Sequence, residues 1–541
     1  MELYINGQIH TMNGNEIVEA MLIEDGIIKA VGTTIELKQL ITADTTIIDL
    51  NNSTVLPGFN DSHLHALMSA TKLKQINLTG ARSKQDIIDL CKKAIPKDLK
   101  DKDWIIGYGW NQDYFDVKEF FTSKDLDEIS TDYPICLIRA CVHVCIVNNK
   151  ALDIINIDHR DYLDDNDYNI GIDDNNELNG LFGEKALALV YDNFPKKSIA
   201  EIKELIVDYV KYLNSKGITS IQSDDFTALS NVTYLEVMQA YQELALANEL
   251  NVNVYQQCLF PEIEQFEEFI AKGYRTTQSF NNYRLGPLKL LLDGSLGARS
   301  AAIRAGYADD QGNHGILIYD DKRLYEYGLL AQKNQMQIAI HGIGDKAIEM
   351  IADMYLKLQQ DYDISNSRHG IVHCQITDKD LLAKIVRSQS VIYAQPIFLN
   401  YDIHMVADRV GADMAFTSYA FKSLKESGLS VSFGTDSPVE DVNPFENMYC
   451  AITRNDLKGN SKPYIDKNEC FTLTEALEAY TKESAYQSFE EDIKGSLEAN
   501  KQADFIVLAA DIFKMSPDEL KKAQVWQTYY KGKLVFQNAK K

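Results

Sequence analysis

The sequence predicts a (β/α)8 barrel that carries a small composite β-sandwich and an inserted subdomain, an α/β fold supported by three observations. Short apolar runs alternate with helical segments through the middle of the chain, and both ends carry strand-and-turn patterns. One interval between two strand candidates is far too long for a simple connection. At 541 residues, the chain also exceeds the ~250–300 residues at which a single core stops growing.

Eight apolar runs in the middle of the chain have the character of buried parallel strands. The best marked helix between them begins at the capping box Ser198-Ile-Ala-Glu201, continues with apolar residues at helical spacing and stops at Gly217. Strands that alternate with helices indicate parallel pairing, and eight such units close a barrel. The eight strand candidates are residues 55–60, 218–222, 252–258, 287–292, 336–340, 370–373, 390–394 and 429–433.

The two ends of the chain share a hairpin-rich β pattern. Alternating strand candidates lie before residue 56, and two more, 503–508 and 528–536, follow Gly495. Neither end is large enough to bury a core alone. We therefore expect residues 1–56 and 485–541 to form one composite β-sandwich domain, with residues 57–484 forming the barrel.

The interval between the first and second strand candidates predicts an inserted subdomain over about residues 70–200. Two acidic stretches within it, 164–171 and 173–180, resemble calcium loops at first sight. Their ligand and glycine spacing does not match an EF-hand, so we interpret them as a solvated acidic loop.

Composition excludes several classes of partner. A formal charge of −25 argues against a nucleic-acid partner, which would require a basic face. The start of the chain has no signal-peptide pattern. The most apolar stretch of the whole chain, residues 133–147, is too short to cross a bilayer. The eight cysteines form no Cys-x-x-Cys pair and no disulfide framework. We expect a cytoplasmic protein that acts on a small molecule and has neither a membrane nor a nucleic acid as its partner. A homodimer is possible.

Side chains of the metal-ligating type occur where the predicted strands end, which is where parallel barrels have their active sites. A strand places alternate side chains on one face, so the first two histidines can hold one ion together. Three or more imidazoles with oxygen donors suit zinc best, with iron, manganese or nickel as alternatives. The candidate ligands are His63, His65, Lys289, His341, His373 and Asp436.

Each candidate also has a structural alternative. The histidines could be hydrogen-bonded core residues, and Asp436 could cap a turn ahead of Pro438. Lys289 lies in a strand of leucines, where an unpaired ammonium is costly. It could pair with Asp293 or Asp436, or CO2 could carbamylate it into an anion that bridges two metals. Six such residues at strand ends make a purely structural explanation improbable for the set.

These motifs resemble the metal-dependent amidohydrolase superfamily, and more narrowly amidohydrolase family 3, the branch that includes N-substituted formamide deformylases. The resemblance covers nearly the whole chain. It implies metals held by the six candidate ligands, with Lys289 carbamylated. The matching segments are Pro57-Gly-Phe-Asn-Asp-Ser-His-Leu-His65, Lys289 with Asp293-Gly-Ser-Leu-Gly-Ala-Arg299, His341-Gly-Ile-Gly-Asp345, His373-Cys-Gln375 and Gly434-Thr-Asp-Ser-Pro438.

The resemblance also indicates Trp110 and His143 as substrate-side residues, although each could instead be a core residue. Arg299 could orient a carboxylate or form a structural salt bridge. Two departures from the family pattern, Val372 and Cys374, adjoin a ligand and leave the choice of metal open.

The expected reaction is hydrolysis of an amide, formamide or related C–N bond by metal-activated hydroxide. One or two divalent ions per chain would supply the hydroxide, and Asp436 would transfer the proton. The alternatives are a mononuclear deaminase on the same scaffold and a non-catalytic ligand-binding relative.

Overall fold

The structure is a computed structural model that describes residues 1–541 apart from 15, 97–98, 101–102, 142, 163–167 and 540–541. The chain divides into two compact units. One comprises residues 1–66, 206–226 and 237–541, and the other comprises residues 67–205 and 227–236. Among the described residues, no helix combines the length and the apolar character needed to span a bilayer.

Eight parallel strands of the first unit form a nearly closed barrel sheet, which confirms the predicted (β/α)8 fold. The two end strands, β22 and β8, are linked where the loop after β22 passes β8, because the Asp436 N–H donates to the His63 carbonyl at 2.8 Å. In spatial order the strands are β8 (Phe59–Leu64), β15 (Ile218–Asp224), β16 (Asn253–Leu259), β18 (Tyr283–Leu291), β19 (Ile338–Gly342), β20 (Gly370–His373), β21 (Val391–Ala394) and β22 (Val431–Phe433).

The first barrel strand differs from the prediction. The apolar run at 55–60 is divided between two sheets: β7 (Thr54–Pro57) pairs with the C-terminal strand β23 (Phe505–Leu508), and the barrel strand starts at Phe59. Gly58 lies at the division, where a Cβ would come within 2.1 Å of Thr219 Oγ1. The missing side chain therefore lets the chain leave one sheet and enter the next beside β15.

Helices follow the barrel strands in the expected alternation. Side chains fix several of their starts: Ser198 and Glu201 form the predicted capping box, while Asp320 and Asp378 cap later helices by accepting backbone N–H groups. The main helices are α7 (Ile199–Ser215), α8 (Tyr234–Leu246), α9 (Ile263–Ala271), α10 (Asp321–Lys333), α11 (Asp345–Asp361), α12 (Lys379–Ser388), α16 (Phe421–Glu426), α17 (Pro444–Thr453), α18 (Leu473–Ala479) and α19 (Lys482–Gln487).

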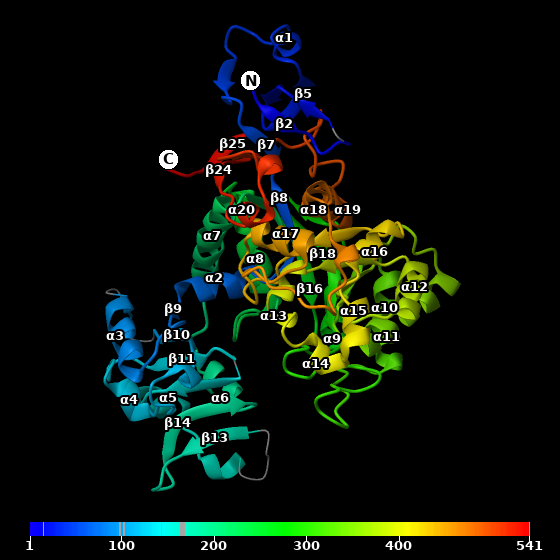
Figure 1. Cartoon of the computed structure of the whole chain (residues 1–541). Helices are drawn as coiled ribbons and strands as arrows, with labels where there is room; N and C mark the ends of the chain where they lie inside the picture. Colours follow the sequence, from blue (N-terminus) through cyan, green and yellow to red (C-terminus); the bar gives the residue numbers. More distant parts are fainter. Residues whose placement is uncertain (15, 97–98, 101–102, 142, 163–167, 540–541) are drawn as a thin grey trace. The chain divides into compact units, whose positions relative to one another are not determined.

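The two ends of the chain share a sheet in the first unit. It has the order β25-β24-β23-β7-β2-β3 and brings strands from both ends side by side, coloured red and blue in Figure 1. A second sheet, β5-β4-β1-β6, packs against it: Tyr4 meets Phe505 and Tyr529 edge-on, with ring centroids 5.2 and 5.6 Å away. The predicted boundaries of this composite domain, after 56 and before 485, stay a prediction. The strands not bounded above are β1 (Glu2–Ile5), β2 (Gln8–His10), β3 (Ile17–Val18), β4 (Ala20–Glu24), β5 (Ile27–Gly32), β6 (Thr46–Asp49), β24 (Val525–Tyr530) and β25 (Lys533–Gln537).

The second unit is built on a six-stranded mixed sheet of order β13-β14-β12-β11-β10-β9. Of the two acidic stretches, 164–171 and 173–180, the structure confirms a solvated loop only for residues 173–177, which form a turn outside the strands. The flanking residues belong to β13 (Tyr168–Ile172) and β14 (Leu178–Glu184), which pair as antiparallel strands. Residues 163–167 lie outside the described residues. The other elements are β9 (Ile76–Asn77), β10 (Ile105–Trp110), β11 (Ile135–Arg139), β12 (Val144–Val147), α3 (Lys84–Ala94), α4 (Ser123–Asp127), α5 (Asn149–Ile155) and α6 (Leu187–Tyr191).

Candidate metal centre

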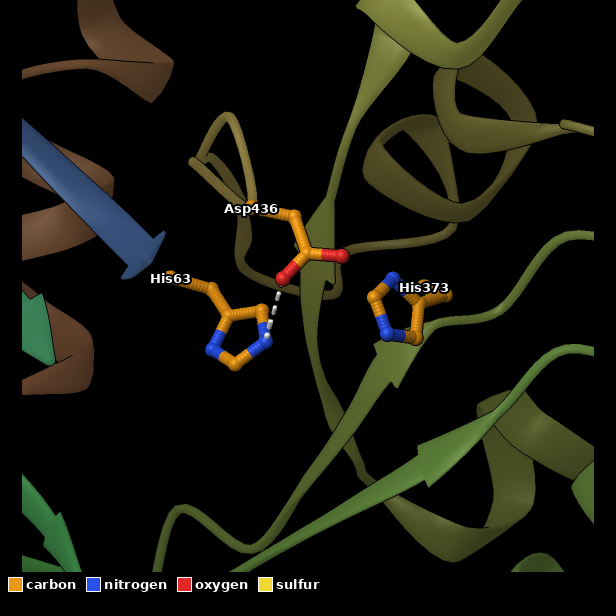
Figure 2. A group of neighbouring side chains, drawn as sticks. All are labelled: His63, His373 and Asp436. Atoms are coloured by element: carbon orange, nitrogen blue, oxygen red, sulfur yellow. Dashed lines mark ion pairs between the residues drawn. The ribbon is translucent and has the colours of Figure 1, made fainter. Parts of the chain in front are cut away.

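The barrel brings three of the predicted ligands into one buried cluster. The ligand atoms of His63, His373 and Asp436 all lie within 4.8 Å of one another. His63 lies within β8, His373 ends β20, and Asp436 follows β22, so three strand ends supply the group. Figure 2 shows the Asp436 carboxylate between the two imidazole rings, with its Oδ1 3.4 Å from His63 Nε2.

His65 and His341 extend this cluster on either side. His65 Nε2 lies 3.0 Å from Asp436 Oδ1, and the His65 ring centroid is 5.3 Å from that of His63. The His341 ring is 4.5 Å from the His373 ring, centroid to centroid. Four imidazoles and one carboxylate therefore meet at the C-terminal end of the barrel, as the sequence predicted from the strand ends.

Neighbouring acceptors fix which nitrogen each imidazole presents. His63 Nδ1 lies 2.7 Å from Gln257 Oε1, and His373 Nδ1 lies 2.8 Å from Gln395 Oε1. An amide oxygen only accepts, so each Nδ1 carries the proton. His65 Nδ1 is held in the same way, 3.0 Å from the main-chain carbonyl of Asp224. Nε2 is therefore the nitrogen that each of these three histidines can present to a cation, and in His65 it faces Asp436 Oδ1.

His341 is held by its other nitrogen. Its Nε2 lies 3.1 Å from the Gly294 carbonyl and 3.3 Å from Asp293 Oδ1, so the proton sits on Nε2 and Nδ1 is left as the ligand atom. Asp293 is fixed in turn by three backbone N–H donors, those of Ala302, Ile343 and Gly344, at 2.9, 3.1 and 2.8 Å. The loop after β18 thus orients a candidate ligand on β19.

Lys289 lies buried inside the barrel, but its partner differs from both predicted salt-bridge partners. Its Nζ is 3.5 Å from Asp224 Oδ2, and each side chain is at most 2% exposed. Asp224 ends β15 and Lys289 lies on β18, so the pair spans β16. Both Asp224 carboxylate oxygens are buried and accept no hydrogen bond from the described residues. A buried carboxylate with no hydrogen bonds is expected at a site built to bind a cation.

Backbone strain marks the same positions. His373 has φ +76°, its neighbour Cys374 has φ +52°, and Asp436 has φ +56°. Left-handed backbone is unfavourable for non-glycine residues, and such strain concentrates at functional sites. The turn at Asp436 is fixed by Asp61, whose carboxylate accepts from the Thr435 hydroxyl at 2.7 Å and the Thr435 N–H at 3.2 Å.

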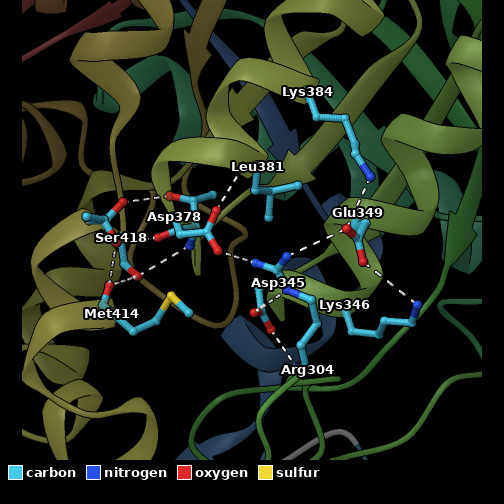
Figure 3. A network of polar contacts seen from close by, with 11 residues as sticks. Arg304, Asp345, Lys346, Glu349, Asp378, Leu381, Lys384, Met414 and Ser418 are labelled. Carbon is cyan, nitrogen blue, oxygen red and sulfur yellow. Dashed lines mark hydrogen bonds and ion pairs between the residues drawn. The ribbon is translucent and has the colours of Figure 1, made fainter.

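A polar network holds together the loops that carry the ligands (Figure 3). Arg304, in the loop after β18, donates to Asp345 at 2.7 Å and to Asp378 at 2.5 Å. Asp345 begins α11, four residues after His341, and Asp378 caps α12, five residues after His373. One guanidinium therefore fixes the loops of three adjacent strands relative to one another.

The charges in the cluster are strongly coupled. Burial, with the positive charge of Lys289, lowers the pKa of His63 to about 4. Burial also opposes charge on His65, but the adjacent Asp436 carboxylate raises the pKa of His65 to about 9. Burial likewise opposes charge on Asp436, yet its bonds to the two histidines hold its pKa well below the usual range. Asp436 is therefore an ionised carboxylate at neutral pH.

Trp110 and His143 belong to the second unit, and all three predicted substrate-side residues contact partners outside the set of candidate ligands. Trp110 is fully buried in the core of the second unit, where its Nε1–H donates to the Leu137 carbonyl at 2.9 Å. His143 is exposed and lies 3.3 Å from Glu184, so the alternative of a core histidine is wrong. Arg299 forms a two-point salt bridge with Asp309 at 2.9 and 3.1 Å.

We expect Trp110→Ala to destabilise the second unit, because the ring packs against Phe121 and the neighbouring core. Large-to-small changes at such positions cost roughly 3–5 kcal/mol. Urea unfolding followed by circular dichroism, with limited proteolysis of residues 67–205, measures the effect. Tyr114→Ala is the matched control, because Tyr114 is 59% exposed and should change little. Unchanged stability with an altered substrate profile would instead support the predicted substrate role.

Sequence reasoning missed Asp224, Gln257 and Gln395. Each has a local signal: Asp224 closes a run of buried polar residues in β15, and both glutamines lie in or directly after apolar strands. Buried polar side chains in a barrel interior need partners. The sequence does not say which histidine each one meets, because that depends on strand order across the barrel.

Comparison with known proteins agrees with this geometry. A family model described as Amidohydrolase family matches residues 46–536. YtcJ of Bacillus subtilis (strain 168) is 30% identical over 542 residues, covering 99% of both chains. The N-substituted formamide deformylase of Arthrobacter pascens is 22% identical over 551 residues, covering 99% of this chain and 98% of that protein. The crystal structure of an uncharacterised metal-dependent hydrolase from Pyrococcus horikoshii OT3 has a TM-score of 0.81 at 27% identity, covering 95% and 99% of the two chains. The chain belongs to the amidohydrolase family.

Proposed function

We propose that this protein is a metal-dependent hydrolase that cleaves a C–N bond of a small molecule, an amide, formamide or related group. The observation that carries the proposal is the buried cluster of His63, His373 and Asp436, whose ligand atoms lie within 4.8 Å of one another. The named relatives support the hydrolytic class, and the Arthrobacter pascens deformylase supports a formamide-like substrate.

The residues present fit a divalent cation. Three imidazoles are anchored through Nδ1 and one through Nε2, so each ring has its other nitrogen directed to the cluster. The proton that Asp436 stabilises on His65 would be displaced when a cation binds. The buried Asp224 carboxylate accepts no hydrogen bond from the described residues, and Lys289 Nζ lies 3.5 Å from its Oδ2. Nitrogen and oxygen donors in this number suit zinc. The proposed ligands are His63, His65, Lys289, His341, His373 and Asp436.

The chain's own groups carry the proton chemistry. When bound, a divalent ion would acidify water and polarise the substrate carbonyl. Asp436 is ionised, and its Oδ1 lies within 3.4 Å of two histidine Nε2 atoms, so its carboxylate can accept the proton of the attacking water at Oδ. The same oxygen can return that proton to the departing nitrogen, whose leaving requires protonation.

The two alternatives differ from the proposal in defined features. A mononuclear deaminase on this scaffold would use a glutamate acid/base and would have no use for a lysine inside the barrel, whereas Lys289 is 1% exposed beside the cluster. A non-catalytic relative would not need to retain oriented ligands. The fixed imidazole tautomers favour a working metal site over the non-catalytic alternative.

We expect the purified protein to carry one to two divalent ions per chain and to lose hydrolytic activity in proportion as a chelator removes them. Mass-spectrometric metal analysis, paired with activity on a panel of N-formyl, N-acyl and cyclic amides, measures both. Adding zinc back should restore activity to the stripped protein. Full activity with less than about a tenth of an ion per chain would contradict the proposal, since the activity of a metal-dependent enzyme should be proportional to its metal content.

A further inference from the structure

The loops after β20 and β21 hold a second group of polar side chains beside the candidate metal centre. Gln375 follows His373 by two residues, and Asp402 ends the short helix α13 (Leu399–Asp402). Phe398, directly before that helix, stacks on the His373 ring at 5.6 Å between centroids and 21° between planes. The group is therefore joined to the centre through the chain and through a ring contact.

Both hydrogen bonds to the Asp402 carboxylate are accepted by the same oxygen. Its Oδ2 accepts from Gln375 Nε2 at 2.9 Å and from the Tyr419 hydroxyl at 2.7 Å. Asp402 Oδ1 accepts no hydrogen bond from the described part of the chain. Gln375 Oε1 is buried and also has no partner among the described residues. Two acceptor atoms on neighbouring side chains thus lack a protein donor among the described residues.

The carboxylate also lacks a counter-ion. Among the described residues, no Lys, Arg or His nitrogen lies within 4.0 Å of Asp402, and its two donors are neutral. Burial raises the pKa of Asp402 to about 6, although Tyr419 and Gln375 offset part of this effect. Asp402 is therefore mostly ionised at neutral pH, while its side chain is half-buried. An uncompensated, desolvated carboxylate is strongly stabilised by a bound cation.

We propose that Asp402 Oδ1 and Gln375 Oε1 bind a protonated amino group of the substrate. Two acceptors without a donor match an ammonium, which only donates. Phe398, which stacks on His373 and directly precedes the helix that ends at Asp402, would pack against the apolar segment that joins the amino group to the scissile bond. The inference rests on the proposed function and names its substrate class: amides that carry a second, cationic nitrogen.

The charge of the whole chain is consistent with a cationic ligand. A formal charge of −25 raises the local concentration of cations around the protein and repels anionic substrates. This field acts on every cation, so it cannot by itself produce selectivity between a buried subsite and the surface. The selectivity is assigned to Asp402, and the test depends on that residue.

The first test measures binding without turnover. Benzylammonium and benzyl alcohol have similar size and differ in charge, and their affinities are measured by ligand-observed NMR at pH 7.5 and moderate salt. We expect the metal-loaded protein to bind the ammonium about 10-fold more tightly, and Asp402→Asn to abolish this preference. Metal content should stay unchanged in the variant. Repeating the titration after chelation excludes binding of the free amine to metal.

Tyr419→Phe is the matched control. It removes one hydrogen bond to Asp402 Oδ2 but leaves the carboxylate, so the preference for the ammonium should remain. If Asp402 served only to position Tyr419 and Gln375, Asp402→Asn and Tyr419→Phe would have the same effect on the two probes. Equal affinity for both probes in the unaltered protein, or a preference that survives Asp402→Asn, would overturn the subsite.

Turnover measurements test the ammonium subsite separately from the proposed reaction. N-acyl diamines and N-acyl alkylamines of equal length are compared as substrates, and we expect kcat/KM to favour the diamines about 10-fold through KM. Turnover without that preference would reject the subsite and leave the proposed function intact. Ammonium binding at Asp402 without turnover of any amide would reject the function and leave the binding site.

Discussion

Lys289→Ala is expected to remove bound metal and hydrolytic activity together, and small carboxylic acids are expected to restore part of both. We propose that Lys289 reacts with CO2, so that its neutral amine forms a carbamate and releases one proton. A carbamate would be an anion with two oxygens and could hold two metals. Alanine leaves a buried space beside Asp224, which formate or acetate can enter to supply the missing oxygens.

The expected loss is at least about 10³-fold in kcat/KM, comparable with removal of a principal electrostatic group. Metal per chain and kcat/KM are measured across a series of acetate and propionate concentrations, with chloride as the control for ionic strength. Both quantities should rise together with the carboxylate, because they depend on the same vacated site.

Lys289→Arg distinguishes the carbamate from a simple ion pair. Arginine keeps the positive charge that faces Asp224 but forms no stable carbamate, so we expect an inactive variant that carboxylic acids do not rescue. If the pair with Asp224 were the whole role of Lys289, arginine would be the milder change and alanine the worse one. A bare ammonium in electron density of an active, two-metal enzyme would also refute the carbamate.

The barrel was predictable because its strands are buried on both faces, so they occur in the sequence as apolar runs. The exception is informative. The run at 55–60 looks continuous, but Gly58 divides it between two sheets, because only glycine fits beside Thr219. Periodicity does not detect such a division, since both halves are equally buried. The prediction therefore started the barrel strand too early, at residue 55 instead of Phe59, but it still placed His63 at the barrel.

The candidate ligands were predictable because they lie at or near strand ends, while their partners were not. The sequence offered Asp293 and Asp436 as partners of Lys289, yet Asp224 on β15 faces it across the barrel. That contact depends on which side chains point inward at one level of a closed sheet. Asp293 instead holds His341 through the loop after β18. Pairings of this kind require coordinates.

Asp436→Asn is expected to reduce kcat about 10²–10⁴-fold, or ~3–5 kcal/mol of transition-state stabilisation. Asparagine keeps the shape and one oxygen that can face His63 and His65, but it cannot accept a proton from water. The pKa of Asp436 is held well below the usual range, so the wild-type carboxylate is ionised throughout neutral pH. Steady-state kinetics with metal analysis of the same sample measure the loss.

Asp61→Asn is the control for a buried carboxylate near this turn. Asp61 accepts from the Thr435 hydroxyl and from the His63 N–H at 3.1 Å, so it holds the turn that carries Asp436. We expect this variant to lose stability in thermal unfolding while its turnover per bound metal falls less than about 10-fold, because Asp61 transfers no proton in the proposed reaction.

Comparing the two variants therefore distinguishes a structural role of a carboxylate from a role in proton transfer. A stable, metal-loaded Asp436→Asn protein that retains more than a tenth of wild-type turnover would assign the proton transfer to another group. Low turnover with little bound metal would show that Asp436 acts mainly as a ligand. Full metal, normal stability and a turnover loss of two orders of magnitude or more is the expected combination, because asparagine keeps one oxygen that can ligate the metal but cannot accept a proton.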